Sequence, residues 1–447
     1  GQVWNDDGSL KIYPIDDMNS YVNIMADDQP YAYENNRKTT SINIAPFVEF
    51  RPLKGLMYKS LVSASISNSR TGVWDGLNTY MELTGSQSPN QRSATYSNSN
   101  GWGYTWQNIL NYNFTIADRH DITLTGITEY GKSRSEGNSM YNEEFNFDEY
   151  LYYNFTDGEN KTTETSYSES SKMSYALRAN YSMLGRYLLS ASVRWDGASV
   201  LYKDKRWNAF PAVSAGWRIS DEPFMTDARD WMDNMKLRLS FGTSGNDQIA
   251  SGLTETLWTT SATTVNGESV TTYQPGKILG NPDLKWETTI SRNIGVDFSL
   301  WNGKLHGSVD LYHNTTKDVL MLVPCDPTTG FSFQMQNIAQ TSNKGIEVSL
   351  NYEVVRRKDW NISFGLTYNF NKNNVDKLQD GVLASAHTNW GSTMRVPTYD
   401  YIVKEGEPVG LVQGMQNAGL YTVDDFKVVN GIWTLKPGIP DNVMTKL

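Results

Sequence analysis

Many segments of the chain alternate apolar and polar residues with a period of two. The clearest runs from Trp360 to Phe370, where every second residue is apolar and the residues between are polar or small. Successive side chains of a β-strand point to opposite faces, so each such segment predicts a strand with one apolar and one polar face. Similar runs occupy residues 42–50, 175–182, 187–196, 293–300 and 346–353. We therefore expect an all-β chain.

The connections between the predicted strands divide into two kinds. Short polar turns join strands in pairs at 52–55, 117–120, 183–186 and 301–304, with a slightly longer one at 354–359. Longer segments separate these pairs, at about 69–101, 133–172, 243–285 and 314–343. One connection of the short kind instead carries a helix-like stretch from Asp221 to Met235. A β-sandwich has no reason to keep this parity, whereas a membrane β-barrel has short periplasmic turns and long extracellular loops.

The polar faces of the predicted strands carry many charged residues. Those expected to face inward include Arg178, Arg194, Asp196, Arg218, Lys236, Arg238, Asp297, Asp310 and Glu347. So many charges would carry a severe desolvation cost in a dry core, but a wet or plugged interior accommodates them. We predict that Arg178, Arg194, Asp196, Arg218 and Arg238 form a charge network on this face.

Hydropathy and aromatic placement agree with membrane strands. No segment approaches the roughly 18 consecutive apolar residues of a membrane helix, but a membrane strand needs only about 10 residues. Aromatic residues that we place near strand ends, where a membrane interface favours them, are Tyr58, Tyr130, Tyr187, Trp195, Trp217 and Trp360. Twelve strands are predicted by residue 370, and 399–403 with 410–421 suggest one further hairpin. The expected fold is a transmembrane antiparallel up-and-down β-barrel.

Charge, cysteine and histidine content exclude several other functions. The net charge of −10 argues against nucleic acid as a partner. A single cysteine, Cys325, excludes an intrachain disulfide, and the four histidines lack metal-ligand spacing. Adjacent carboxylates give no specific sign of an acid–base pair, so we expect neither an enzyme nor a cofactor. Loop carboxylates that bind Ca²⁺ are the one metal alternative.

Four ordered stretches resemble SusC/RagA-type TonB-dependent transporters. The first is RWDGAS at 194–199, followed by RWNAFPAVSAGW at 206–217 and DEPFM at 221–225. The second is LRLSFGTSGN at 237–246, and the third is GNPDLKWET at 280–288, which leads through NIGVDF at 293–298 to TKD at 316–318. The fourth is NKGIEV at 343–348. Their order and spacing are similar to those of the second half of that family's barrel.

The resemblance implies a barrel of about 22 strands in the outer membrane of a Gram-negative bacterium, filled by an N-terminal plug. It also implies a segment that contacts TonB and a SusD-like surface lipoprotein over the mouth. Residues 1–447 are then expected to form 12–14 strands of the barrel, in contact with outer-membrane lipid and without the plug or the C-terminal strands. The implied function is active import of an oligosaccharide or a peptide. The alternatives are a passive porin or adhesin, and a secreted β-rich carbohydrate-binding module.

Aromatic residues in the long segments are the candidate ligand-binding residues. They are Trp258 and Tyr273 in one segment, Phe331 and Phe333 in another, and Trp390 in a third. Sugar rings stack on exposed aromatic faces while polar neighbours bind the hydroxyls. The alternative for these residues is packing of loop against loop or against a partner lid.

Overall fold

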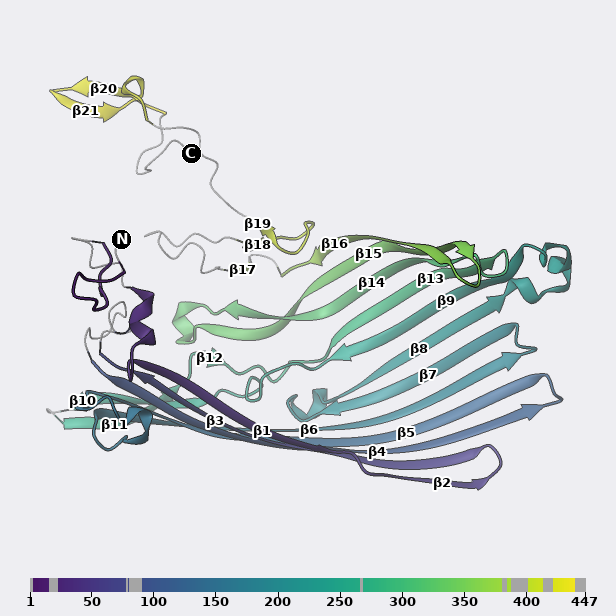
Figure 1. Cartoon of the computed structure of the whole chain (residues 1–447), viewed down its shortest axis with the longest axis horizontal. Coiled ribbons are helices and arrows are strands. Elements are labelled where there is room, and N and C mark those ends of the chain that lie inside the picture. The colour runs from purple at the N-terminus through teal and green to yellow at the C-terminus, as the bar shows by residue number, and fades with distance from the viewer. Residues whose placement is uncertain are drawn as a thin grey trace. The chain divides into compact units, whose positions relative to one another are not determined.

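The computed structural model of the chain consists almost entirely of β-strands (Figure 1). It describes residues 3–15, 23–77, 79, 91–265, 268–379, 384–386, 401–412 and 421–438. The chain divides into two compact units, described separately below. Unit 1 comprises residues 1–215, 247–256 and 282–285, and unit 2 comprises 216–246, 257–281 and 286–447.

Long antiparallel strands form one large sheet with the order β1-β3-β4-β5-β6-β7-β8-β9-β13-β14-β15, while β2 pairs with β3 and β16 with β15. The strands up to the unit boundary are β1 (Tyr33–Ile44), β2 (Phe47–Leu53), β3 (Leu56–Asp75), β4 (Ser93–Ile116), β5 (His120–Glu143), β6 (Glu159–Met183), β7 (Tyr187–Ala198) and β8 (Trp207–Arg218). Those of unit 2 are β9 (Met232–Asn246), β13 (Glu287–Leu300), β14 (Leu305–Pro324), β15 (Phe333–Arg356) and β16 (Asn361–Lys377).

The smaller elements lie in the connections. The strands are β10 (Trp258–Val265), β11 (Glu268–Pro275), β12 (Ile278–Leu279), β17 (Ala384–Ala386), β18 (Tyr401–Val403), β19 (Leu411–Val412), β20 (Phe426–Val429) and β21 (Ile432–Leu435). The 3-10 helices are η1 (Ile24–Asp28), η2 (Leu151–Tyr153), η3 (Lys203–Lys205), η4 (Ile219–Asp221), η5 (Pro223–Ala228), η6 (Pro327–Thr329) and η8 (Val423–Asp425). No helix in the described ranges is long and apolar enough to cross a membrane.

The first predicted strand is interrupted. Strands β1 and β2 both pair with β3, and Ala45 and Pro46 lie between them. Proline has no N–H to donate to the ladder, but the Pro46 carbonyl still accepts from the Val62 N–H at 3.0 Å. The large sheet has fourteen strands among the described residues. When β1 and β2 are counted as one interrupted strand, thirteen remain, which are the twelve predicted by residue 370 and the short β12. The prediction is confirmed for the described residues.

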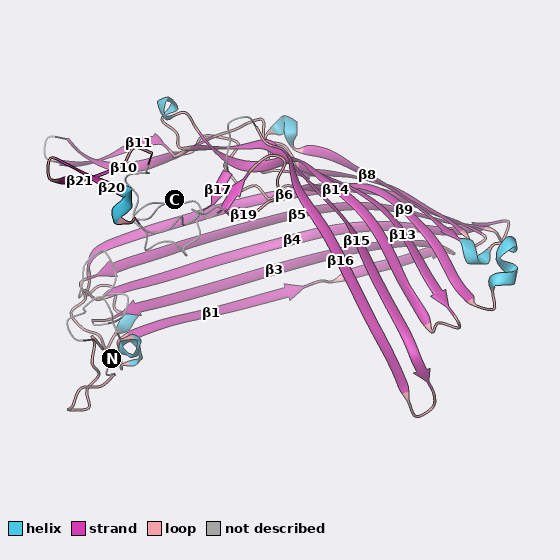
Figure 2. Cartoon of the chain, turned by 90° about the horizontal axis from the view of Figure 1, so that it is seen from above, coloured by secondary structure: helices cyan, strands magenta, loops and turns pink. Residues whose placement is uncertain are grey.

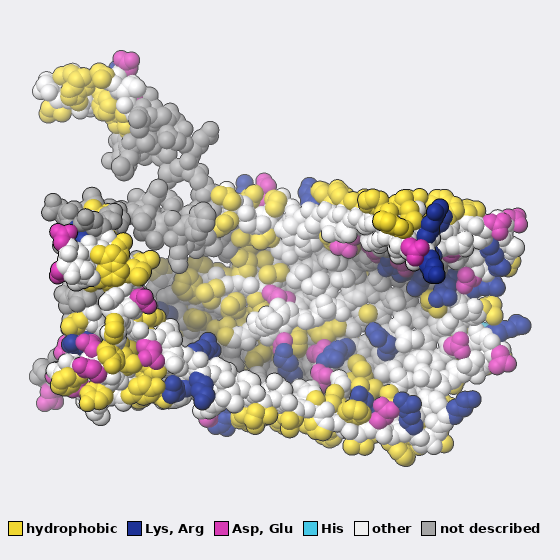
Figure 3. All heavy atoms as spheres, viewed as in Figure 1, with side chains coloured by type: hydrophobic (Ala, Val, Ile, Leu, Met, Phe, Trp, Pro, Cys, Tyr) yellow, Lys and Arg dark blue, Asp and Glu magenta, His cyan; other side chains and the backbone are white. Residues whose placement is uncertain are grey.

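The register sorts side chains onto two faces, as the alternation predicts. In unit 1, Leu177 lies opposite Val193 on one face, and Arg178 lies opposite Ser192 on the other. In unit 2, Leu350 lies opposite Leu366 on the face that also carries the pairs Ile346–Phe370 and Val348–Tyr368. The apolar face is exposed: Leu177 retains 59% of its accessible surface. In Figure 3 the surface toward the viewer is mostly white with scattered charged side chains, and hydrophobic side chains gather along its margins.

The tight turns fix which ends of the strands meet. The turn between β4 and β5 has positive φ at Ala117 and Asp118, and that between β6 and β7 has positive φ at Leu184 and Gly185. Consecutive left-handed residues match the twist of paired strands, which is why such turns join them closely. The β8–β9 connection carries only the short helices η4 and η5 (Figure 2), and β9 begins at Met232. The predicted helix-like stretch is therefore confirmed up to Ala228, as 3-10 helix, and is wrong from Met232 to Met235, where β9 begins.

The strands are much longer than the sequence predicts. Two of the segments expected as loops, 133–172 and 314–343, are mostly strand, because β5 continues to Glu143 and β14 to Pro324, and β3 likewise continues to Asp75 in a third. On the apolar face of β4, Trp102 and Tyr112 lie about 34 Å apart along the strand at about 3.4 Å per residue. At a tilt of about 40° this spacing covers about 26 Å, close to the roughly 25 Å apolar band of a membrane barrel. The remaining length of β4 therefore projects beyond that band.

This projection explains one misplaced aromatic residue, Tyr130. Tyr58, Tyr187, Trp217 and Trp360 lie at or next to strand ends as predicted. Tyr130 lies in the middle of β5, and Trp195 lies three residues before the end of β7. Alternation can be read only while one face stays apolar, and beyond Tyr130 the same face of β5 carries Lys132 and Arg134. The strand continues there with two polar faces.

The last predicted hairpin exists in part. Strands β18 and β19 pair antiparallel around Lys404–Gly410, but they form a small sheet with β17 and do not extend the large one. The turn docks on β16, where the Val375 N–H donates to the Glu407 carbonyl at 2.9 Å and the Gly406 N–H donates to the Val375 carbonyl at 2.8 Å. Residues 399–400 and 413–420 of this prediction lie outside the described residues.

We expect an arginine at position 193 to impair membrane assembly. Val193 lies on the apolar face of β7, and a cationic side chain near the bilayer midplane costs about 2–4 kcal/mol. The matched control is Ser190→Arg on the polar face of the same strand. Folding into lipid vesicles, measured as the heat-resistant fraction in gel electrophoresis, should fall for Val193→Arg and stay near wild type for the control. Equal behaviour of the two variants would show that the faces are wrongly assigned.

Candidate functional site

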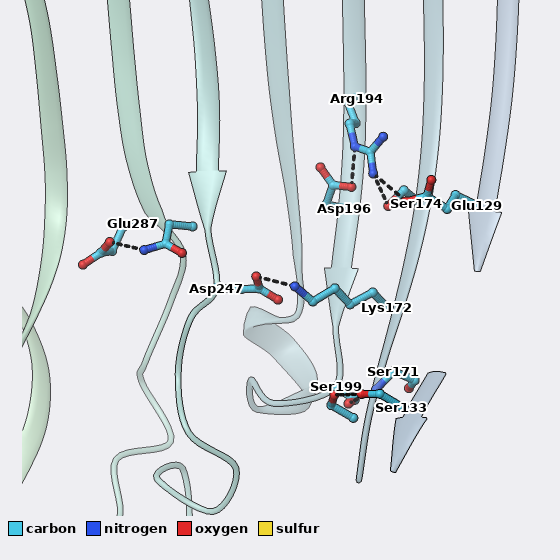
Figure 4. Close-up of polar contacts among 12 residues, drawn as sticks. Glu129, Ser133, Ser171, Lys172, Ser174, Arg194, Asp196, Ser199, Asp247 and Glu287 are labelled. Atoms are coloured by element: carbon cyan, nitrogen blue, oxygen red, sulfur yellow. Dashed lines mark hydrogen bonds and ion pairs between the residues drawn. The ribbon is translucent and has the colours of Figure 1, made fainter. Parts of the chain in front are cut away.

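Arg194 is the centre of a polar cluster on unit 1 (Figure 4). Its Nε donates to Asp196 Oδ1 at 2.7 Å, within β7. Its second terminal nitrogen donates to Glu129 Oε1 at 3.1 Å and to Ser174 Oγ at 2.8 Å. Register places these groups on one face, because Ser174 pairs with both Asp196 and Glu129. Three neighbouring strands are thereby tied by one guanidinium.

The cluster extends to one side through neutral and charged partners. Gln107 on β4 donates its side-chain N–H to Glu129 Oε2 at 2.9 Å. Lys172 Nζ contacts Asp247 Oδ1 at 2.7 Å; the Asp247 side chain is almost fully buried, whereas Lys172 is largely exposed. The charges of Arg194, Glu129, Asp196, Lys172 and Asp247 thus each have an opposite charge as partner, which lowers the cost of removing them from water.

Unit 2 has a second arginine cluster of the same design. Arg238 on β9 donates from Nε to Asp297 Oδ2 at 2.8 Å and from a terminal nitrogen to Asp310 Oδ2 at 2.9 Å. Gly295 lies between these strands, opposite both Arg238 and Asp310. A Cβ at this position would come within 2.7 Å of the Arg238 guanidinium, so glycine leaves the space that the ion pairs occupy.

The predicted network therefore resolves into arginines that each have their own partners. Arg194 and Asp196 pair directly, and Arg238 binds two aspartates that were also predicted to face inward. Arg218 approaches only Asp221, at 4.0 Å, on an exposed part of unit 2. Arg178 lies on the polar face of β6 but forms no ion pair with a described residue. Glu129 and Ser174, which complete the Arg194 cluster, were not singled out from the sequence.

A broad hydroxyl-rich surface lies on the same face of unit 1. In three successive cross-strand rows, from β1 to β6, every residue is Ser, Thr, Asn or Gly: Asn43–Ser65–Gly103–Ser133–Ser170, Ser41–Ser67–Gly101–Ser135–Ser168 and Thr39–Ser69–Ser99–Gly137–Ser166. Hydroxyls bond across strands, for example Ser133 with Ser170 at 2.9 Å. Small residues at every second position of five segments are the sequence signal that could have identified this surface.

At two of its three glycines, Gly101 and Gly103, this hydroxyl surface is not forced by packing within the chain, whereas a Cβ on Gly137 would come within 2.8 Å of Ser166 Oγ. A Cβ on Gly101 would have its nearest neighbours at 3.9 and 4.0 Å, and one on Gly103 at 3.4 and 3.5 Å, which are ordinary contacts. A recess of about 580 Å³ opens here, with Glu129 and Lys172 among its lining residues. At Gly101 and Gly103 this polar surface therefore has no side chain, although larger residues would fit.

The structure brings two predicted ligand-binding aromatics together. Trp258 on β10 pairs with Pro275, and Thr260 pairs with Tyr273 on β11. Because residues two apart share a face, Trp258 and Tyr273 are diagonal neighbours on one face of this hairpin. They retain 67% and 74% of their accessible surface. Packing against other described loops therefore does not account for these two rings.

The other predicted aromatics lie at the base of the same loop system. Phe333 begins β15 and pairs with Ile278 of β12, just after the β10–β11 hairpin. Ser332 donates its N–H to the Lys277 carbonyl at 2.8 Å, which ties the two segments together. Phe331 and Phe333 are less exposed than Trp258 and Tyr273. Trp390 lies outside the described residues.

The loop at 144–158 is clamped to unit 1 by a bidentate ion pair. Arg92 donates to both carboxylate oxygens of Asp148, at 2.7 and 2.9 Å, and this bonding raises the pKa of Arg92 above its ordinary value. Behind the clamp, Trp74, Ala94, Phe145 and Tyr152 form a small buried core. Hydrogen bonds from the Asn146 side chain and backbone lower the pKa of Asp157 in the same loop. This part of the loop end is a rigid structure.

No metal centre is formed within the described ranges. They contain no group of three or more His, Cys, Asp or Glu side chains that could hold an ion. His120 Nδ1 instead bonds the Tyr181 hydroxyl at 2.7 Å, and His306 Nδ1 bonds the Gly303 carbonyl at 3.0 Å. His387 lies outside the described residues. Calcium binding by loop carboxylates stays a prediction.

Removal of the Arg194 guanidinium should destabilise the folded wall. In Arg194→Gln, Glu129 and Asp196 lose their cation, and we expect a loss of about 1–2 kcal/mol in the free energy of unfolding. This is less than for a fully buried pair, because the Arg194 side chain is 41% exposed. Urea unfolding in lipid vesicles measures the change.

The matched control for Arg194→Gln is Arg178→Gln. Arg178 has the same charge on the same face but lacks an ion pair with a described residue, so its loss should change the free energy of unfolding by less than about 0.5 kcal/mol. Adding Glu129→Gln to Arg194→Gln should recover part of the loss. A larger effect at position 178 than at 194 would contradict the assigned pairing.

Comparison with known proteins adds family information to this geometry. Residues 4–401 match the family model "TonB dependent receptor-like, beta-barrel". TonB-dependent receptor P39 of Formosa agariphila is 30% identical over 409 residues, which cover 88% of this chain and 36% of the relative. TonB-dependent receptor SusC of Bacteroides thetaiotaomicron is 36% identical over 219 residues, which cover 47% of this chain and 21% of the relative.

The fold has a counterpart among solved structures. A structure of the RagAB peptide transporter superposes with a TM-score of 0.79 and 22% identity, covering 99% of this chain and 48% of that chain. At this identity the likeness shows the fold alone. The chain spans 36% of P39 and 41% of TonB-dependent receptor P3, also from Formosa agariphila. By the family match and the P39 relationship, the chain belongs to the TonB-dependent receptor β-barrel family.

Proposed function

We propose that the protein to which this chain belongs imports a nutrient, an oligosaccharide or a peptide, across the outer membrane of a Gram-negative bacterium. The chain forms part of the barrel wall, which is a sheet with an apolar face toward lipid and a polar face toward a wet interior. The observation that carries this proposal is the register, which in unit 1 puts the Arg194 cluster and the hydroxyl surface on one face and apolar side chains on the other.

The partners follow from the family and are part of the proposal. Energy is supplied through TonB, and a SusD-like lipoprotein covers the outer mouth, as the resemblance to SusC implies. Within the interior, the hydroxyl surface and its recess are wettable and have few large side chains, so they leave room for a plug or for passing cargo. The loop aromatics Trp258, Tyr273, Phe331 and Phe333 are the proposed cargo contacts.

The two alternative functions, a passive porin and a secreted binding module, each require a different interior from the one proposed. A passive porin needs a steady open path, and a secreted binding module needs an apolar interior between its sheets. The paired charges of Arg194 and Arg238 on the polar face fit a wet interior and not a dry one. We therefore favour import through a wall of this type, and no observation here favours a secreted module.

Uptake measurements on the full-length protein separate active from passive transport. In liposomes of matched lipid, the purified protein should give little swelling with maltose or with a dipeptide, because a gated interior does not conduct freely. In cells, uptake of the cognate nutrient should require an intact TonB gene. Fast swelling with small solutes, together with TonB-independent uptake in cells, would support the porin and contradict active import.

A further inference from the structure

The β10–β11 hairpin is an arm with one distinctive face. It forms a two-stranded sheet of its own in the connection between β9 and β13, at the end opposite to the tight turn at Trp301–Lys304. In the membrane orientation of this family, that end faces the outside. Figure 1 shows β10 and β11 side by side, apart from the labelled ends of β9 and β13 near their turns. Ligands from outside can therefore reach the hairpin.

Register assembles an aromatic platform on this face. Trp258 lies opposite Pro275, and Tyr273 lies on the next same-face pair, opposite Thr260. Diagonal cross-strand neighbours are about 7–8 Å apart, within the reach of large side chains. One ligand can therefore contact both rings and Pro275, which lies opposite Trp258. Thr260 and Thr271 add hydroxyls beside the rings on the same face.

The charge distribution narrows the chemistry of the ligand. Glu268 is the charged residue of the two strands, and it pairs with Val265 on the opposite face. The aromatic face thus combines apolar rings with hydroxyl groups and has no formal charge. A pyranose ring has the complementary surface, since its C–H face stacks on an aromatic ring while its equatorial hydroxyls bond polar neighbours. A charged peptide or an anionic ligand finds no partner on this face.

The exposure of these rings also requires a reason. Trp258 and Tyr273 keep about two thirds or more of their surface in contact with solvent, next to the exposed Leu257. Grouped apolar side chains that remain exposed on a protruding element mark an interaction site more often than chance. A platform that is flat, aromatic and rimmed by threonines suits a sugar chain that binds and leaves.

We propose that the Trp258–Tyr273 face of the β10–β11 hairpin binds the sugar rings of an uncharged oligosaccharide at the outer side of the membrane. This inference rests on the proposed import function and narrows it to a glycan as cargo. Trp258 and Tyr273 each stack on a sugar ring, and Pro275 contacts the ligand beside Trp258. Thr260 and Thr271 bind hydroxyls of the sugar. Phe331 and Phe333 lie outside this platform.

The test is glycan binding by the full-length protein in detergent. An array of neutral oligosaccharides identifies a ligand, and calorimetry with that glycan then gives the Kd of each variant. Trp258→Ala and Tyr273→Ala should each weaken binding about tenfold, as loss of an aromatic anchor does at other interfaces. Trp258→Phe keeps a ring and should recover most of the affinity.

Two control variants test whether weaker binding comes from lost stacking on these two rings. One controls for a change in the hairpin fold, and the other controls for the loss of any exposed aromatic ring. Thr259→Ala lies on the opposite face of β10, and Trp360→Ala removes an exposed ring at the turn end of β16. Both should bind the glycan as the wild type does. The variants at 258, 259 and 273 should assemble into membranes normally, because they lie in a small hairpin outside the large sheet, and Trp360→Ala is compared as assembled protein.

Three results would overturn the proposal. They are failure of the wild type to bind any neutral glycan on the array, unchanged affinity in Trp258→Ala and Tyr273→Ala, and loss of lipoprotein lid binding in these variants with glycan affinity intact. The last result would make the hairpin a lid contact. TonB-dependent uptake of a peptide with no glycan binding would remove the glycan inference while leaving the proposed import function in place.

Discussion

The antiparallel hydrogen-bond ladder is the constraint on which the rest of this structure depends. In hydrocarbon, each unpaired backbone N–H or C=O costs several kcal/mol, so a membrane strand must be paired along its length. Pairing of β4 with β5 runs without interruption from Ser93–Glu143 to Ile116–His120. Once register is fixed in this way, the period-two alternation decides which side chains meet lipid and which meet water. The two faces of the wall are a consequence of the ladder.

The same register explains how charges are accommodated. Glu129, Ser174 and Asp196 occupy same-face positions on three neighbouring strands, so one arginine on β7 can bind all of them. Arg238, Asp297 and Asp310 repeat the arrangement in unit 2, with Gly295 providing the space. Partial solvation limits what each pair contributes to stability. Their larger effect is to keep one side of the wall polar while each carboxylate of the two clusters has a cation as partner.

Part of the fold and of the candidate site could be predicted from the sequence alone. Alternation in 187–196 and 360–370 identified strands and faces correctly, because one face of each is apolar throughout. The long projection of β5 was missed, since beyond Tyr130 both faces become polar and periodicity disappears while pairing continues. That of β14 was missed because Val319–Val323 is apolar on both faces and so shows no alternation either. Glu129 was missed because its role depends on register across three strands, which no linear spacing contains. Trp258 and Tyr273 were found by residue type, but only pairing shows that they share a face.

The central claim is that adjacent residues of one strand face lipid and water in turn. Cys325 is the single cysteine, so Cys325→Ser gives a background for spin labels at positions 177 and 189 on the apolar face and 190 and 192 on the polar face. In lipid vesicles, electron paramagnetic resonance should show labels at 177 and 189 relaxed mainly by oxygen, which partitions into hydrocarbon. Labels at 190 and 192 should be relaxed mainly by a water-soluble nickel complex. Equal access of the nickel complex to all four positions would contradict the account.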